Sequence, residues 1–166
     1  KADRKVEIRA PQRGDKRSLV EQATRSAAEA LSRKLAETAS QARLLKEVAK
    51  AFDLKAPPNR IEIYDNSPIQ GSKMVGGMVV AGPEGFDKGQ YRKFNIKDKT
   101  VEPGDDYGMM REVMRRRFAR ALKDREEGKS ETWPDLVLID GGLGQLSAVT
   151  EAIADVGLTP EDVTLV

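Results

Sequence analysis

The stretch Pro134-Asp135-Leu136-Val137-Leu138-Ile139-Asp140-Gly141-Gly142 decides how this chain folds. Its centre, residues 136–139, is apolar without alternation, which is typical of a strand that is covered on both faces and paired in parallel. A helix is predicted directly after this strand, from about Gly144 to Val156. We therefore expect an α/β fold in which this strand lies inside a sheet and Asp140 stands at its end.

Upstream of this strand, short β-rich segments alternate with turn residues. Residues 61–64, 74–80 and 91–96 predict an antiparallel meander of three strands, and a helix should follow from Asp106 to about Lys123. The parallel strand at 136–139 is then the fourth, and residues 163–166 resemble the opening of a fifth. The expected fold is a mixed sheet flanked by helices.

The first third of the chain has a different composition. Residues 18–52 are rich in Ala, Leu, Glu, Lys and Arg and contain no Gly or Pro, which predicts one long helix or two consecutive ones. Pro57 and Pro58 end the helical pattern. We expect a helical arm or linker at 1–57 and a domain at 58–166. This domain is expected to be incomplete at its carboxy end, in a piece of a longer protein, because the chain lacks an initial Met and stops inside the fold.

Composition excludes several kinds of chemistry. The chain has no Cys and no His, so thiolates and imidazole cannot act as ligands, bases or nucleophiles, and carboxylates must carry any reaction. The net charge of +2 does not by itself indicate a nucleic-acid partner. The longest apolar run is far shorter than the roughly 20 residues of a membrane span. We expect a soluble, cytoplasmic protein without a membrane partner.

Three acids are candidates for catalysis and metal binding. Asp65 and Asp140 follow the first and fourth strands, and parallel neighbouring strands would set them side by side. Asp106 shares a helical face with Met110 and Val113, whereas Asp105 fits a helix cap. Carboxylates suit Mg²⁺ or Mn²⁺, which serve phosphodiester cleavage. Ordinary turn chemistry at Asp65 and Asp140, and a first-turn acid at Asp106, stay open as alternatives.

Basic residues accompany these acids. The predicted DNA-binding set comprises Arg92 and Lys93 on the third strand and Arg111, Arg115, Arg116 and Arg120 on the helix. A solvated helix face is the alternative interpretation of the helical arginines. The glycines at 141, 142 and 144 could also indicate a loop for ATP or GTP, but the full phosphate-loop pattern is missing.

Taken in order, the motifs resemble one family, UvrC, the incision subunit of bacterial nucleotide excision repair. The resemblance covers nearly the whole chain and is carried by Pro11-Gln12-Arg13-Gly14, Ile61-Glu62-Ile63-Tyr64-Asp65-Asn66-Ser67, Tyr91-Arg92-Lys93-Phe94-Asn95-Ile96, Pro103-Gly104-Asp105-Asp106-Tyr107, Met114-Arg115-Arg116-Arg117-Phe118, and residues 134–142 with Gly144-Gln145-Leu146.

This resemblance implies an RNase H-like endonuclease domain that cuts damaged double-stranded DNA on the 5′ side of the lesion, acting on a UvrB–DNA complex. Asp65 and Asp140 match the family's strand-end metal ligands, and Asp106 matches a third acid associated with incision. The UvrB-binding segment lies outside these 166 residues.

Two positions depart from the family pattern. Family members usually carry a histidine where this sequence has Pro68, and the family's catalytic histidine lies beyond residue 166. Whether the chain cleaves DNA by itself is therefore left open. A non-catalytic module that docks DNA or the UvrB–DNA complex is the alternative function.

Overall fold

The computed structural model describes residues 11, 13–69, 73–98, 100–102, 104–129 and 132–166, without the side chains of 66–69, 73 and 74. Contacts divide the chain into two compact units, residues 1–40 and 41–166. This division falls inside the first helix, so the arm at 1–57 and the domain at 58–166 stay a prediction. The first ten residues of the predicted arm, and residue 12, lie outside the described part of the chain.

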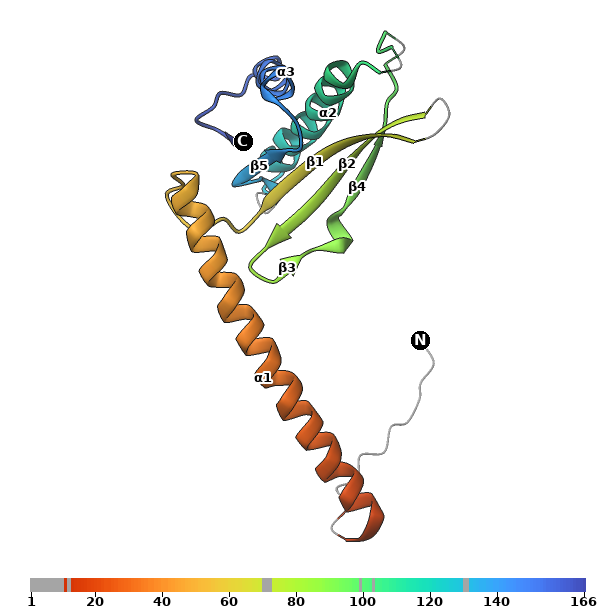
Figure 1. The fold of residues 1–166 in the computed structure, drawn as a ribbon, viewed down its shortest axis with the longest axis vertical. Helices are drawn as coiled ribbons and strands as arrows, with labels where there is room; N and C mark the ends of the chain where they lie inside the picture. The colour runs from red at the N-terminus through yellow and green to blue at the C-terminus, as the bar shows by residue number, and fades with distance from the viewer. Residues whose placement is uncertain (1–10, 12, 70–72, 99, 103, 130–131) are drawn as a thin grey trace. The chain divides into compact units, whose positions relative to one another are not determined.

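The elements follow the predicted order (Figure 1). They are α1 (Gly14–Ala51), β1 (Ile61–Ile69), β2 (Lys73–Gly82), β3 (Gly85–Phe86), the 3-10 helix η1 (Lys88–Gln90), β4 (Arg92–Asn95), α2 (Asp106–Glu126), β5 (Leu136–Ile139), α3 (Leu143–Ala154) and β6 (Thr164–Leu165). β3 and η1 were not predicted, because two or three residues are too few to show a period.

α1 is one helix, as its unbroken run of strong helix formers predicts, and it begins four residues before the predicted start at Ser18. Within residues 41–166, its last turns bury Leu45 and Ala49, and Leu45 joins a hydrophobic cluster with Ile61 and Leu136. In the first unit the helical pattern leaves apolar side chains in solvent, since Leu35 is 62% exposed.

The sheet has the order β3-β2-β1-β5-β6, and β4 also pairs with β2. β1 and β2 are antiparallel, β2 and β4 are antiparallel, and β1 and β5 are parallel from Ile61↔Leu136 to Tyr64↔Ile139. The predicted α/β fold, an antiparallel meander joined to a parallel fourth strand, is confirmed. β6 extends the sheet in parallel beyond β5, as expected for a fifth strand.

β1 is longer than predicted. The sequence pattern predicts that this strand ends at Tyr64 and that Asp65 follows it, but the backbone of β1 pairs with β2 as far as Ile69↔Lys73. Asp65 therefore lies within the strand, and the predicted end of this strand at Tyr64 is wrong. Antiparallel pairing with β2 continues after β5 has ended, because the two neighbours of β1 differ in length.

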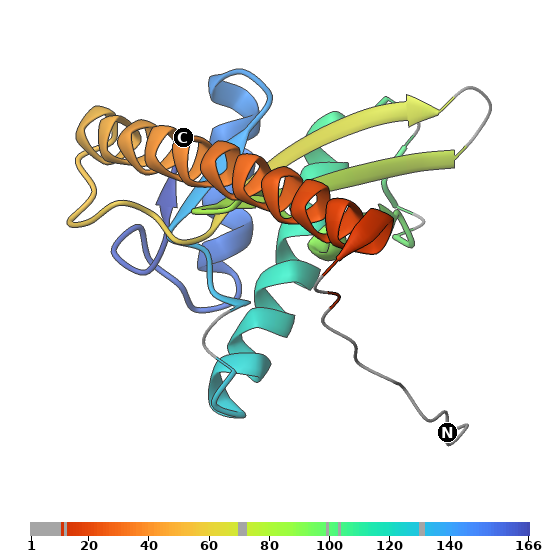
Figure 2. The same cartoon turned by 90° about the horizontal axis from the view of Figure 1, so that it is seen from below.

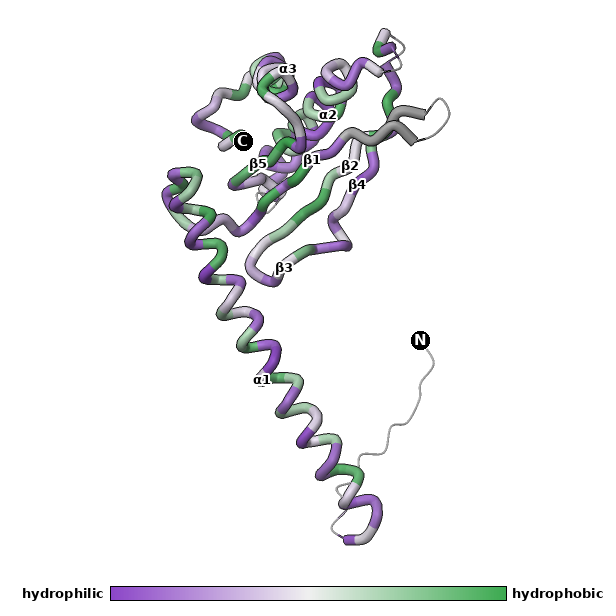
Figure 3. The backbone as a smooth tube through the Cα atoms, viewed as in Figure 1, coloured by the Kyte–Doolittle hydropathy of each residue, from purple (hydrophilic) through white to green (hydrophobic). Residues whose placement is uncertain are grey.

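α2 and α3 pack beside each other on one face of the sheet, as Figure 1 and Figure 2 both show. Tyr64, Met78 and Val137 project from the strands into a core that also contains Met110 and Val149 of the helices. Figure 3 shows the matching hydrophobic stretch along β5. Together the helices and the sheet fix the position of β1 and β5, the two strands that carry the candidate acids.

Within the part of the chain that the structure describes, no helix is long and apolar enough to cross a membrane.

Candidate metal and nucleic-acid site

Two carboxylates lie on neighbouring strands where the parallel pairing stops. The last pair of the β1–β5 register joins Tyr64 to Ile139, and the NH of Asp140 donates to the carbonyl oxygen of Tyr64 at 2.9 Å. Continuing the register by one residue sets Asp65 beside Asp140. The side-by-side placement expected from the sequence is therefore supported by backbone pairing.

Asp65 and Asp140 lie on the same face of the sheet. Ile63 and Leu138, two residues before each acid, pack against the cluster that contains Leu45 of α1. Because side chains alternate along a strand, Asp65 and the continuation of β5 at Asp140 lie on this face. Both residues are exposed. Two adjacent anionic groups repel each other, and a bridging cation relieves this repulsion.

The third acid begins α2. Asp105 caps the helix as predicted, because its Oδ1 accepts from the NH of Gly108 at 2.8 Å. Asp106 itself is exposed, whereas Met110, one turn later, is fully buried. The expectation that Asp106 points into the core with Met110 is not met, because Asp106 is exposed although Gly108 and Met109 of the same turn are buried.

The starts of α2 and α3 approach each other closely. A Cβ atom at Gly144 would lie 2.7 Å from Oη of Tyr107, so the tyrosine ring covers the first turn of α3. The NH of Gly142 donates to Oε1 of Gln145 at 3.1 Å, and a Cβ at Gly141 would meet the same side chain. The glycines thus allow close contacts at the start of α3. The contact of Gly144 with Tyr107 brings the loop after Asp140 close to the turn that carries Asp106.

Among the described residues, no three or more Asp, Glu, His or Cys side chains gather as a metal-binding group. Asp106 is therefore not joined to Asp65 and Asp140 in one closed cluster. Asp65 and Asp140 alone still fit Mg²⁺ or Mn²⁺, because these cations keep several waters and are commonly held by one or two carboxylates plus substrate phosphates. Their hard oxygen atoms and their exposure match that need.

The predicted basic face of α2 is divided by its contacts. Arg115 turns to α3 and pairs with Asp155, with 3.0 Å between Nε and Oδ2. Arg116 turns the other way, and its guanidinium lies 5.8 Å from the ring centroid of Phe94 on β4. Arg120 contacts Asp124, with 2.9 Å between Nε and Oδ1. The interpretation of a single solvated face is therefore too simple.

The other predicted DNA-binding residues differ in exposure. Arg92 and Lys93 are exposed on β4, and Arg111 is half-buried on α2. Arg92 donates to the carbonyl oxygens of Gly89 at 3.2 Å and Tyr91 at 2.8 Å. Arg92, together with Arg116 and Arg120, lines one cavity. Arg115 instead belongs to the contact between α2 and α3.

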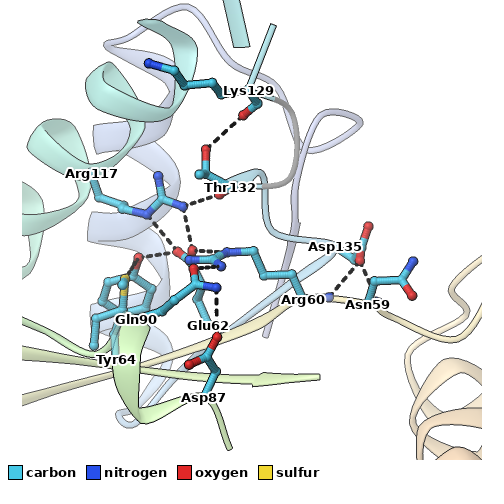
Figure 4. Close-up of polar contacts among 11 residues, drawn as sticks. Asn59, Arg60, Glu62, Tyr64, Asp87, Gln90, Arg117, Lys129, Thr132 and Asp135 are labelled. Carbon is cyan, nitrogen blue, oxygen red and sulfur yellow. Dashed lines mark hydrogen bonds and ion pairs between the residues drawn. The ribbon is translucent and has the colours of Figure 1, made fainter. Parts of the chain in front are cut away.

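A buried ionic network, drawn in Figure 4, was not predicted from the sequence. Glu62, which is 0% exposed, accepts from Nε of Arg60 at 2.7 Å and from Nε of Arg117 at 3.0 Å. Tyr64 donates its hydroxyl to the same carboxylate at 2.6 Å. Arg117 also donates to the carbonyl oxygen of Thr132. The network ties α2 to β1 and to the segment before β5.

Burial and the charge of Glu62 shift the pKa of Tyr64 in the same direction and that of Arg117 in opposite directions. Burial raises the pKa of Tyr64 well above its ordinary value, and the charge of Glu62 raises it further. Burial lowers the pKa of Arg117, but the hydrogen bond and charge of Glu62 outweigh this and leave it raised. Arg117 is therefore charged and Tyr64 is neutral at physiological pH.

A signal for the network was present in the sequence. Glu62 and Tyr64 are two residues apart, so both lie on the face of β1 that the helices cover. Arg117 follows Val113 and Met114 at helical spacing, on the buried side of α2. Both charged residues thus occupy core positions. Pattern reasoning treats such charges as surface groups, because buried charges are rare unless they are paired.

An α/β fold with a mixed sheet, two helices on one face and acids on adjacent strands defines an RNase H-like domain. The family described as "UvrC RNAse H endonuclease domain" matches residues 49–166, and the one described as "UvrC Ribonuclease H-like domain" matches residues 1–34. This chain belongs to the UvrC RNase H endonuclease domain family.

Curated relatives named "UvrABC system protein C" match the whole chain. Identity is 69% with the protein of Hyphomonas neptunium, 60% with that of Caulobacter vibrioides and 57% with that of Ruegeria sp., each over 166 residues. These 166 residues cover 27%, 26% and 26% of the three relatives, so the chain spans about a quarter of their length.

Proposed function

We propose that this chain is the endonuclease core of a nucleotide excision repair protein and cuts damaged double-stranded DNA on the 5′ side of the lesion. The observation that carries this proposal is the placement of Asp65 beside Asp140 at the end of the β1–β5 pairing. Family membership supports it, because the matching family is described as an endonuclease domain.

Asp65 and Asp140 would hold Mg²⁺ or Mn²⁺. When bound, such a cation activates water and stabilises the leaving oxygen of a phosphodiester. Asp106, at the nearby start of α2, serves as a third acid that receives or orients a proton at the entrance to the site. Arg92 and Lys93 of β4 and the arginines of α2 neutralise backbone phosphates and position the duplex.

The partner proposed for this reaction is a UvrB–DNA complex in the bacterial cytoplasm. Support comes from the relatives' name, which places each of them in a UvrABC system. Lesion recognition then lies with the partner, and this chain contributes the cut.

Incision of an end-labelled duplex with one bulky lesion tests the proposal. The protein that carries this chain is incubated with UvrB, the duplex and Mg²⁺ or Mn²⁺. Asp65→Asn and Asp140→Asn, which keep shape and remove charge, are expected to abolish the cut on the 5′ side and to leave DNA binding intact. Chelation of the metal should have the same effect.

Asp53→Asn is the matched control, because Asp53 is an exposed acid with a φ of 51° that asparagine also tolerates. It should cut at the normal rate. Normal 5′ incision by Asp65→Asn or Asp140→Asn would refute the assignment of these acids.

A second function, a non-catalytic module that docks DNA or the UvrB–DNA complex, is favoured by one observation. No group of three or more metal-binding side chains occurs within the described part of the chain. This alternative predicts that affinity for the UvrB–DNA complex is the same with metal and with chelator, and that charge removal at Asp65 changes neither binding nor incision.

A further inference from the structure

An arginine-lined cavity lies away from the acids. Its volume is about 420 Å³, and its walls come from α2, β2, β4 and the segments around them. Five of its lining residues are arginines: Arg60, Arg92, Arg116, Arg117 and Arg120. The acid site described above uses neither Arg60 nor Arg117.

The cavity carries an excess of positive charge. Glu62 serves both Arg60 and Arg117, and this leaves one guanidinium of that pair without a carboxylate of its own. Glu112 contacts Arg116 at 3.0 Å, and Asp124 contacts Arg120 at 2.9 Å.

Arg92 donates to backbone carbonyl oxygens, which are neutral. Among the residues that the structure describes, five guanidinium groups thus face the three carboxylates Glu62, Glu112 and Asp124. An anionic ligand would balance the surplus.

Part of this charge is held rigidly. The residues Arg60 and Arg117 are 8% and 7% exposed, and both are fixed by bonds to Glu62, which is fully buried. An anion that enters the cavity therefore meets guanidinium groups that are already ordered. Binding an anion to ordered guanidinium groups costs less conformational entropy than binding it to flexible surface lysines, which would have to be immobilised.

The remaining walls indicate what kind of anion fits. Met78 and Phe94 add apolar surface beside the arginines, so the cavity suits a group with a charged part and an apolar part. A phosphodiester with its deoxyribose has this character. Guanidinium forks also match the two oxygen atoms that a phosphate presents.

α2 carries Asp106 in its first turn and Arg117 at the cavity. Eleven steps along the helix, at 1.5 Å each, put about 16 Å between these two residues. This distance corresponds to a few phosphate spacings of a B-DNA strand, so DNA bound at the cavity can extend as far as the start of α2.

We propose that this cavity binds a backbone phosphate of DNA other than the phosphodiester that is cut. The proposal rests on the proposed function for the identity of the substrate, and it is independent of the metal chemistry of Asp65 and Asp140. An acidic protein segment is the competing occupant.

The test measures binding of a fluorescent, lesion-free duplex to this chain in chelator, at several salt concentrations. Arg92→Ala and Arg120→Gln should each weaken binding and lower the slope of log K against log salt by about one phosphate contact. Lys123→Ala is the matched control, because Lys123 is an exposed cation of the same helix outside the cavity. It should keep the slope of the unmodified chain.

Three results would overturn the proposal. They are an unchanged slope in both cavity variants, an equal loss in Lys123→Ala, and a loss of poly-glutamate binding in the cavity variants while DNA binding stays normal. Asp65→Asn, measured in parallel, should keep the full slope. A lower salt dependence of DNA binding in the cavity variants alone supports phosphate binding at the cavity, even if the incision experiment refutes the acid site.

A scan with single uncharged methylphosphonate linkages then locates the contact. A linkage that contacts the cavity should weaken binding of the unmodified chain and have no further effect on Arg92→Ala. Equal sensitivity of both proteins at every position would contradict the proposal.

Discussion

At the scale of single residues, Glu62 is the charge on which the interior depends most. Its carboxylate accepts from Arg60, Arg117 and Tyr64, and its side chain is fully buried. Removing one partner of a buried ionic group leaves the others without compensation. Because two guanidinium groups share this one carboxylate, its loss affects both of them.

Glu62→Ala is expected to lower the free energy of unfolding by about 3–5 kcal/mol. Urea denaturation followed by circular dichroism measures this change. Glu151→Ala is the control, since Glu151 is exposed on α3, and it should stay within about 0.5 kcal/mol of the unmodified chain. A loss below about 1 kcal/mol for Glu62→Ala would show that the network is not essential.

The raised pKa of Tyr64 predicts how stability depends on alkaline pH. The unfolded chain ionises this tyrosine near pH 10, whereas the folded chain holds its proton to higher pH. Its contribution is therefore complete below about pH 10 and is lost as the pH rises through the folded-state pKa.

Melting temperature measured across the alkaline range should thus fall more steeply for the unmodified chain than for Tyr64→Phe, which has no hydroxyl to ionise. The comparison is one of slopes, because the substitution also removes the hydrogen bond to Glu62. Parallel slopes would mean that Tyr64 ionises equally in both states.

At the scale of elements, the apolar run at 136–139 predicted β5 and its parallel pairing, because such a run without alternation is typical of a strand covered on both faces. The length of β1 could not be predicted in the same way. Asn66, Ser67 and Pro68 have turn propensities, yet pairing with β2 keeps their backbone in the strand. Tertiary pairing here overrides local preference.

Gly82, at the end of β2, tests how tightly the elements fit. A Cβ there would lie 2.4 Å from the backbone oxygen of Asn59, just before β1. Because backbone must shift, Gly82→Ala should destabilise by about 1–3 kcal/mol in urea unfolding. Gly142→Ala is the control, since nothing lies within 4 Å of a Cβ at that position. Equal effects of the two substitutions would contradict the packing described here.

At the scale of the whole chain, the candidate site draws on segments far apart in the sequence. The sequence predicted that Asp65 and Asp140 lie side by side if the first and fourth strands are parallel neighbours, and the pairing of Tyr64 with Ile139 supports this. The cavity with Arg60 and Arg117 could not be predicted, because charged residues at core positions show their role only when the strands and helices are assembled.

The most direct test of the central claim is a calorimetric titration of this chain with Mn²⁺. Saturable binding is expected for the unmodified chain and for Asp53→Asn, and it should be lost in both Asp65→Asn and Asp140→Asn, because each removes one of the two adjacent carboxylate ligands. Binding that survives in either strand variant, or its absence from a natively folded unmodified chain, would contradict the assignment of a divalent cation to these two acids.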